Sequence, residues 1–149
     1  MKFTLEWKPV IEALDLGAYN PAFKGQSIPV CVNPPQEFMD ERAEIMREFS
    51  ERFDEYAKAQ TRLTSNDEKK VESAQELIKA FQDWSEGHFT PAVHDWYARL
   101  FSYDGDIYSA ADLTEYGRVD VHFLNWLMQR AIEMINEHRS GRKKNSMTR

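Results

Sequence analysis

Two long stretches of the chain carry apolar side chains at helical spacing, and a short polar segment joins them. In residues 33–60 the apolar positions are three or four apart, at Phe38, Met39, Ile45, Met46, Phe49, Phe53 and Tyr56. In residues 65–87 the same spacing recurs, at Val71, Ala74, Leu77, Ile78, Phe81 and Trp84. Such stripes are typical of amphipathic helices. Because few residues separate the two helices, the sequence predicts that they pack antiparallel as a helical hairpin.

Capping residues mark the ends of these two helices. Asn33-Pro34-Pro35-Gln36 predicts the first start, with Asn33 as the N-cap and Gln36 completing a capping box. Ser65-Asn66-Asp67-Glu68 repeats this pattern before the second helix, and Gly87 is a natural stop. The sequence therefore predicts two helices with separate starts and a clear break after the second.

Three further helices are expected after this hairpin. Thr90-Pro91 opens one of them, and the turn Asp104-Gly105-Asp106 ends it. A shorter helix begins at Ser109-Ala110-Ala111-Asp112 and closes at Gly117. Asp120 caps the last helix, which is expected to fray near Ser140-Gly141. With the hairpin, the chain thus predicts about five helices.

The first 32 residues have the pattern of a small β unit. Phe3, Leu5 and Trp7 alternate with polar residues over residues 2–8, which predicts a half-buried strand that Pro9 stops. Residues 10–16 are expected to form one helical turn or an irregular connection, ended by Gly17. Alternation resumes over residues 28–32, where Pro29 favours an edge strand. Two strands alone are marginal, so the unit must pack on the helices.

Charge divides the chain into an acidic body and a basic end. Residues 1–138 carry 14 Lys and Arg against 25 Asp and Glu, whereas the last ten residues carry four cations and no acid. The whole chain has a net charge of −6, which argues against a nucleic-acid-binding body. We expect an α+β, helix-dominated single domain over residues 1–139, made of a β unit (1–32) and a helical body (33–139). Residues 140–149 are expected to be a flexible, disordered basic tail.

The sequence lacks motifs that indicate catalysis. Neither a glycine-rich phosphate loop nor a nucleophile elbow occurs, and the four histidines lack metal-ligand spacing. Cys31 is expected to be a small buried apolar residue, and His94 beside Asp95 is expected at the surface or at a helix cap. No apolar run approaches the roughly 20 residues that span a bilayer. We therefore expect a protein that is not an enzyme, with no cofactor, no metal, and no nucleic-acid or membrane partner.

Two groups of large apolar side chains are candidates for binding a partner. The first is an aromatic group around three helices, namely Trp84, Trp96, Tyr97 and Trp126. The second is the partly methionine-lined stripe of the first helix, namely Met39, Met46, Phe49, Phe53 and Tyr56. For both groups, burial in the core is the favoured interpretation, and a groove or face for a partner helix is the alternative.

The pattern of aromatics and turns resembles the tail assembly chaperones of long-tailed, non-contractile bacteriophages. The segments that carry the resemblance span most of residues 1–139. They are Phe3-Thr4-Leu5-Glu6-Trp7-Lys8-Pro9, Leu14-Asp15-Leu16-Gly17, Pro21-Ala22-Phe23, Val30-Cys31-Val32-Asn33-Pro34-Pro35, His94-Asp95-Trp96-Tyr97-Ala98-Arg99-Leu100-Phe101 and Asn125-Trp126-Leu127-Met128-Gln129-Arg130-Ala131-Ile132. Proteins of this family look like small, acidic, mostly helical chains with a short N-terminal β unit.

This resemblance implies a function in phage tail morphogenesis. It implies binding to the tape measure protein, whose long helical chain exposes apolar surface before the tail tube forms, and it raises the tail tube protein as a further partner. It also implies action in the host cytoplasm and absence from the mature virion. The alternatives are a structural tail component, such as a tube-end or connector protein, and an unrelated small helical adaptor. Homo-oligomerisation is compatible with the sequence, which does not fix the oligomeric state.

The basic tail suggests a hypothesis about the message rather than the protein. Many genes of this family make a longer product by a minus-one ribosomal shift near the end of the short reading frame. Lys143, Lys144 and Asn145 can be encoded as a slippery A-AAA-AAC heptamer four codons before the end of the chain. A synonymous AAG codon at either lysine would remove this hypothesis.

Overall fold

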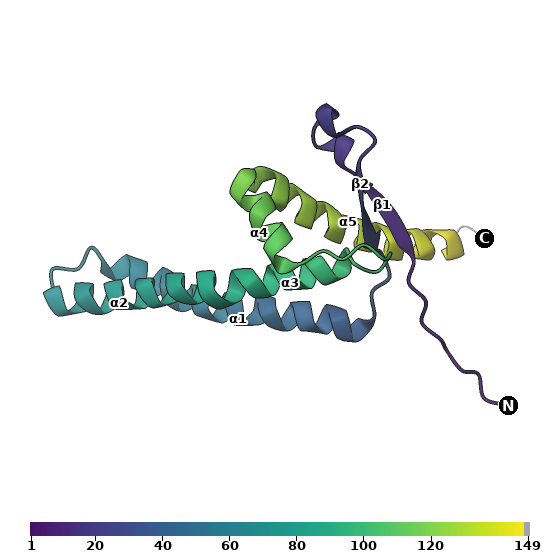
Figure 1. The fold of residues 1–149 in the computed structure, drawn as a ribbon. Coiled ribbons are helices and arrows are strands. Elements are labelled where there is room, and N and C mark those ends of the chain that lie inside the picture. Colours follow the sequence, from purple (N-terminus) through teal and green to yellow (C-terminus); the bar gives the residue numbers. More distant parts are fainter. Residues whose placement is uncertain (148–149) are drawn as a thin grey trace. The chain divides into compact units, whose positions relative to one another are not determined.

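The chain folds into a helix-dominated α+β structure, as the sequence predicts. In the computed structural model, the backbone is described for residues 1–147 and the side chains for residues 1–141. About 69% of the chain is helical, and a two-stranded antiparallel sheet lies near the N-terminus (Figure 1). The elements are β1 (Ile11–Asp15), η1 (Leu16–Ala18), η2 (Pro21–Phe23), β2 (Ser27–Cys31), α1 (Gln36–Arg62), α2 (Glu68–Trp84), η3 (Ser85–Phe89), α3 (Thr90–Leu100), α4 (Ala110–Val119) and α5 (Val121–Met147).

Contacts divide the chain into two compact units. One unit contains Met1–Phe38 together with the residues from His94 onward, and the other is Met39–Val93. The first, here the sheet unit, holds β1, β2, α4, α5 and most of α3. The second, here the hairpin unit, holds most of α1, all of α2 and η3. A single globular domain over residues 1–139 stays a prediction.

The register of the sheet explains how a strand tolerates Pro29. Backbone bonds from Val32 N to Val10 O (2.9 Å) and from Leu16 N to Gln26 O (3.0 Å) bracket the ladder. Pro29 pairs with Ala13, an odd number of residues from both bonded pairs. Because bonded and non-bonded pairs alternate in an antiparallel ladder, the missing N–H of Pro29 removes no bond to β1. The second predicted strand is therefore confirmed, at Ser27–Cys31 rather than 28–32.

The first predicted strand is wrong. Residues 2–8 form no strand, and β1 lies instead at Ile11–Asp15, where a helical turn or irregular connection was expected. The cause is Asn33, whose side chain accepts a bond from Val10 N (2.6 Å) and donates one to Lys8 O (2.9 Å). Trp7 Nε1 also donates to Asn33 O (2.8 Å). Asn33 therefore anchors the N-terminal segment and does not cap α1, which begins at Gln36.

The helix breaks differ from the prediction at one place. Helix α3 begins at Thr90, as predicted, but Gly87 does not end the preceding helix, because α2, η3 and α3 follow one another without a break. Thr90 N bonds to Ser85 O, five residues back, which is a π turn. A proline clashes with the carbonyl four residues before it, here that of Gly87, and the wider π turn relieves this clash. The chain thus continues as a helix through a glycine and a proline.

The remaining helix starts agree with the sequence, with small shifts. Asp67 caps α2 by accepting a bond from Lys69 N (3.0 Å), while Ser65 bonds to Asp67 N before it. Ser109 and Asp112 form the predicted capping box of α4. Asp120 accepts a bond from Phe123 N (3.1 Å) at the start of α5.

Two predicted helix ends move further along the chain. Helix α4 ends at Val119, not at Gly117, and α5 continues past Ser140-Gly141 to Met147. The described part of the predicted tail excludes the side chains after Gly141 and the whole of residues 148 and 149. The flexible basic tail over 140–149 therefore stays a prediction.

The core of the sheet unit is built around α3. Trp96 and Phe101 are fully buried, and Tyr97 is nearly so. Trp96 Nε1 donates to Phe38 O (2.8 Å), and the two rings stack with their centroids 4.5 Å apart. Cys31 is also fully buried, and burial raises the pKa of its thiol. Trp96 and Tyr97 are thus core residues, as the favoured interpretation held, and so is Cys31.

His94 contradicts the expected surface position. It is only 7% exposed, and its Nδ1 lies 2.8 Å from Thr114 Oγ1. Its neighbour Asp95 is exposed and pairs with Arg99 (3.0 Å), so the two residues do not form an acid–base pair. Burial lowers the pKa of His94 below its usual 6.5, because the charged imidazolium loses its water.

Replacement of Trp96 tests the buried stack. Trp96→Ala should lower the free energy of unfolding by about 3–5 kcal/mol, because it leaves a large cavity. Trp96→Phe keeps a ring but leaves the Phe38 carbonyl without its donor, so it should cost about 1–3 kcal/mol. Urea unfolding followed by circular dichroism measures both. Equal losses for the two variants would show that the ring retained in Trp96→Phe contributes nothing to the stack.

The buried imidazole predicts a dependence of stability on pH. The folded pKa of His94 is lower than the unfolded one, so its contribution is complete above pH 6.5 and is lost as the pH falls below 6.5. His94→Gln should flatten this part of the profile. The exposed His88 provides the control, since His88→Gln should keep the slope. The measurement is urea unfolding across this pH range, and an unchanged slope in His94→Gln would contradict the prediction.

Candidate partner-binding surface

Helices α1 and α2 form the predicted antiparallel hairpin (Figure 1). Tyr56, late in α1, stacks on Phe81 of α2 with ring centroids 4.5 Å apart. Phe49, seven residues earlier, stacks on Phe89 of η3 at 4.3 Å. A later residue of α1 therefore contacts an earlier residue of the segment formed by α2 and η3, as antiparallel packing requires. The apolar stripes that the sequence shows on both helices face each other in this way.

Six aromatic rings form a continuous ladder between these helices. Phe49 is a central ring together with Phe81, because it also contacts Phe53 (5.8 Å), Phe81 (5.8 Å) and Trp84 (6.5 Å). Offset and tilted ring pairs at such distances are favourable beyond their burial. We call this set the aromatic ladder: Phe49, Phe53, Tyr56, Phe81, Trp84 and Phe89.

The ladder is not buried within the hairpin unit. All six of its rings are at least partly exposed, and Phe53 is 44% exposed. The fully buried side chains of Met39–Val93 are the small ones of Ala59 and Ala74. Two helices alone can cover only one side of each other's apolar stripe, and a stable domain adds a further layer. The hairpin unit therefore presents a half-covered aromatic surface.

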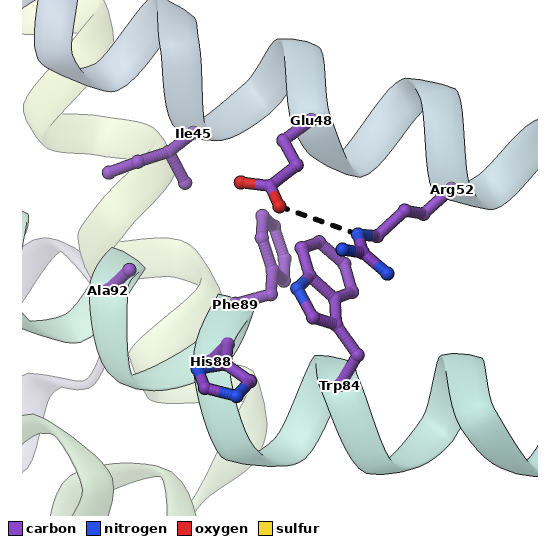
Figure 2. A pocket seen from close by; sticks show the side chains of 7 residues that line it. All are labelled: Ile45, Glu48, Arg52, Trp84, His88, Phe89 and Ala92. Carbon is purple, nitrogen blue, oxygen red and sulfur yellow. Dashed lines mark ion pairs between the residues drawn. The ribbon is translucent and has the colours of Figure 1, made fainter.

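A hollow of about 320 Å³ lies at the η3 end of the ladder (Figure 2). Arg52 places its guanidinium carbon 4.6 Å from the centroid of the Trp84 ring, a cation–π contact. Glu48 pairs with Arg52 (3.4 Å) from one turn earlier in α1. The lining of the hollow thus combines aromatic rings with an ion pair. Its lining residues are Ile45, Glu48, Arg52, Trp84, His88, Phe89 and Ala92.

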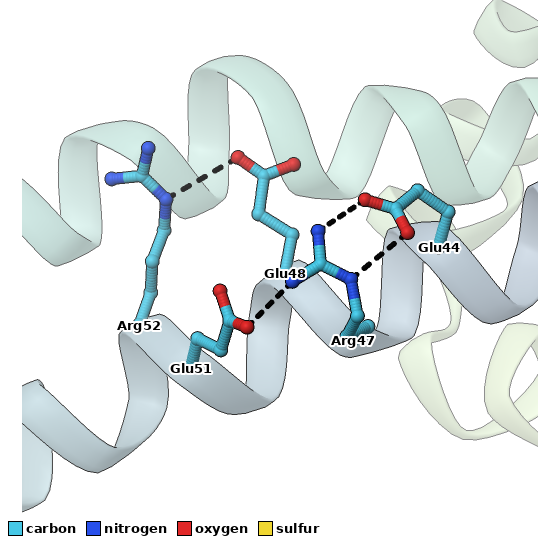
Figure 3. Close-up of polar contacts among 5 residues, drawn as sticks. All are labelled: Glu44, Arg47, Glu48, Glu51 and Arg52. Carbon is cyan, nitrogen blue, oxygen red and sulfur yellow. Dashed lines mark hydrogen bonds and ion pairs between the residues drawn. The ribbon is translucent and has the colours of Figure 1, made fainter.

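The exposed face of α1 is dense in charge (Figure 3). Its glutamates are like-charged neighbours one turn apart, and arginines are placed between them. Arg47 pairs with both Glu44 and Glu51, and Arg52 pairs with Glu48. The hydrogen bond from Arg47 lowers the pKa of Glu44. These pairs are solvent-exposed, so they relieve repulsion along the helix but contribute little to stability.

Most of the negative charge of the chain belongs to the hairpin unit. Residues 39–93 contain 13 Asp and Glu against 8 Lys and Arg, a net charge of −5, while the whole chain has −6. The half-exposed rings therefore lie on the acidic part of the molecule. Such a surface favours a partner with apolar side chains and flanking cations.

The structure separates the residues that the sequence grouped as candidates. Phe49, Phe53, Tyr56 and Trp84 meet in the ladder. Met39 and Met46 lie half-buried on the same helix as the first three of these. Trp96 and Tyr97 belong to the core of the sheet unit. Trp126 lies in the same unit but is only half-buried, and it packs on Tyr19 (5.3 Å) and Phe123 (6.3 Å).

Two members of the ladder were missed as candidates. Phe81 lies in the apolar stripe of α2, but only tryptophan was singled out there. Phe89 was missed because Gly87 was expected to end the helix, and the π turn instead carries Phe89 back to Phe49. A proline four residues after a glycine was the signal in the sequence for this turn.

A second hollow, of about 530 Å³, lies in the sheet unit and was not expected from the sequence. Residues of η1, η2, β2, α4 and α5 line it, most of them apolar or aromatic: Leu16, Phe23, Gln26, Ser27, Ile28, Tyr108, Glu115, Tyr116, Val119, Asp120 and Phe123. Beside it, the Tyr19 hydroxyl donates to Asp120 (2.9 Å), and this bond raises the pKa of Tyr19.

The described residues show neither a metal site nor a membrane-spanning helix. Among the described residues, no group of three His, Cys, Asp or Glu side chains is arranged to hold a metal ion. Within the same part of the chain, no helix has the length and apolar character that a membrane span requires. The chain matches no family model, no curated protein and no solved structure.

Truncation of single rings tests how the ladder holds the hairpin together. Phe49→Ala removes a central ring and should cost about 2–4 kcal/mol of unfolding free energy. Phe53→Ala removes a ring that is already half in water and should cost at most about 1 kcal/mol. Chemical unfolding followed by tryptophan fluorescence measures both changes. A larger loss for Phe53→Ala than for Phe49→Ala would contradict the assignment of Phe49 as a central ring.

Proposed function

We propose that this protein is a binding protein that masks the apolar face of a partner helix, not an enzyme. The observation that carries the proposal is the aromatic ladder, six rings of the two-helix hairpin that are all at least partly exposed. An amphipathic helix laid on the ladder would cover these rings. Large aromatic side chains dominate the energetics of such interfaces.

The charge around the ladder suits a protein that keeps an apolar client in solution. The net charge of −5 on the hairpin unit favours solubility of the occupied protein over aggregation. It also speeds association with clients whose apolar face is flanked by lysine or arginine. Exposed rings on an acidic unit thus combine client binding with solubility, which is the physical requirement for a holdase.

We further propose that the client is the tape measure protein of a long-tailed phage. The resemblance in the aromatic and turn pattern supports this choice, since the client in that family is a long helical chain. On this proposal the protein acts in the host cytoplasm during tail assembly and leaves the finished virion. The tail tube protein is a further partner, and a frameshifted longer form, slipping at Lys143, Lys144 and Asn145, adds a second recruiting segment.

Co-expression tests the proposal as a whole. The proposal predicts a client that is a long helical protein encoded near this gene, which should stay soluble with the chaperone and aggregate without it. The pair should also run as one complex in size-exclusion chromatography, and absence of that complex would disprove the function. Mass spectrometry of purified virions should find no copy of this chain. Its presence there would favour the structural tail component instead.

Substitution on the ladder distinguishes binding at the proposed surface from non-specific hydrophobic binding. Phe53→Ser should weaken binding of the client about tenfold, because this ring is exposed and adds no buried core of its own. Leu63→Ser provides the control, since Leu63 is similarly exposed at the turn after α1 but is not one of the six ladder residues. Isothermal titration of both variants measures the affinities. Equal losses for the two would place the binding surface elsewhere.

A further inference from the structure

The N-terminal segment has the sequence of a strand but no strand to pair with in its own chain. Phe3 is 87% exposed and Leu5 is 82% exposed, although both lie on the apolar side of an alternating pattern. Figure 1 shows this segment leading away from β1 with no strand beside it. Exposure of two large side chains on one side of a five-residue stretch indicates a surface that another element covers.

The sheet has one edge that is open to such a strand. Among the described residues, β1 pairs only with β2. The bonded pairs at Val10–Val32 and Leu16–Gln26 fix the alternation, so Ile11, Ala13 and Asp15 direct their backbone groups away from β2. On the opposite edge, the position of Pro29 has no N–H to donate. The outer edge of β1 is therefore the better receptor for an added strand.

The segment does not reach this edge within its own chain. Pairing residues 2–6 with β1 of the same chain would require residues 7–10 to form the turn of a hairpin. Asn33 instead holds Trp7, Lys8 and Val10 through three hydrogen bonds, and Val10 O accepts the bond from Val32 N. A turn there would break these bonds. A second copy can use the edge without disturbing them.

We propose that residues 2–6 of one copy pair antiparallel with Ile11–Asp15 of a second copy, and that the exchange is reciprocal. Both stretches are five residues long, and one two-fold axis near Pro9 generates both pairings. The register that sets Thr4 opposite Ala13 also sets Lys2 opposite Asp15, which are oppositely charged. The same register sets Phe3 opposite Leu14, so the apolar side of the segment joins the buried face of the sheet.

This exchange explains why a two-stranded ribbon suffices in the sheet unit. Two-stranded sheets are marginal, and the exchange joins two of them into a four-stranded sheet. It also removes the exposed edge of β1, which is otherwise a template for uncontrolled pairing. The proposal does not involve the aromatic ladder, so it stands independently of the function proposed above.

Molar mass in solution tests the dimer. Light scattering after size exclusion, over a concentration series of the full chain, should give twice the mass of one chain at the upper end. Thr4→Pro removes the N–H that bonds to the partner's Ala13 carbonyl and should shift the dissociation constant at least tenfold upward. Thr4→Ala keeps this N–H and should leave the dimer intact. A monomer throughout the series would mean that the segment has another occupant, and the proposal would be wrong.

Disulfide cross-linking tests the register and whether the pairing is between chains. Leu5 and the partner's Glu12 form a non-bonded pair in the proposed register, with Cα atoms about 4.5 Å apart, which suits a disulfide. Leu5→Cys with Glu12→Cys should therefore give a covalent dimer on non-reducing gels. Leu5→Cys with Ala13→Cys is the control, because these side chains lie on opposite faces of the sheet. A disulfide within one chain, or equal cross-linking of the two variants, would overturn the proposal.

Discussion

The stack of Phe38 on Trp96 is the contact on which the sheet unit depends. It joins the first turn of α1 to α3, and the indole N–H satisfies the Phe38 carbonyl at the same point. Phe38 also meets Tyr103 edge-on, and Tyr103 meets Trp7, so the rings continue to the anchored N-terminal segment. Asn33 fixes that segment by hydrogen bonds at the end of β2. Apolar stacking and one amide side chain thus place the strands, the helices and the N-terminus relative to each other within this unit.

The spacing of apolar residues predicts the helices well because it reflects interactions within each helix and its immediate surroundings. Each stripe must face something apolar, and the capping residues Ser109, Asp112 and Asp120 act within one turn of their own positions. The strand predicted at residues 2–8 was wrong, because an alternating pattern shows that a segment can join a sheet but not whether a partner strand is present. The conformation of this segment depends instead on Asn33, which is about 25 residues away in the sequence. No pattern within residues 2–8 carries this information.

The candidate surface was only partly visible in the sequence for a related reason. Trp84 and Trp96 have similar helical surroundings, yet one is half-exposed and the other fully buried. The two residues differ in how completely other elements of the fold cover them. The spacing of apolar residues along the chain does not encode this. Phe89 depended on a π turn that brings it back to Phe49. The sequence therefore identified four of the six ladder rings as candidates, but not the geometry that leaves them in water.

Because the ladder rings are partly exposed, the stability of the protein depends on whether a partner covers them. Any molecule that covers the ladder binds the folded state and not the unfolded chain, so it raises the free energy of unfolding in proportion to the logarithm of its concentration. An empty copy then opens more often than an occupied one and is the easier substrate for a protease. The exposed ladder that binds a partner therefore also limits the lifetime of copies that have no partner bound.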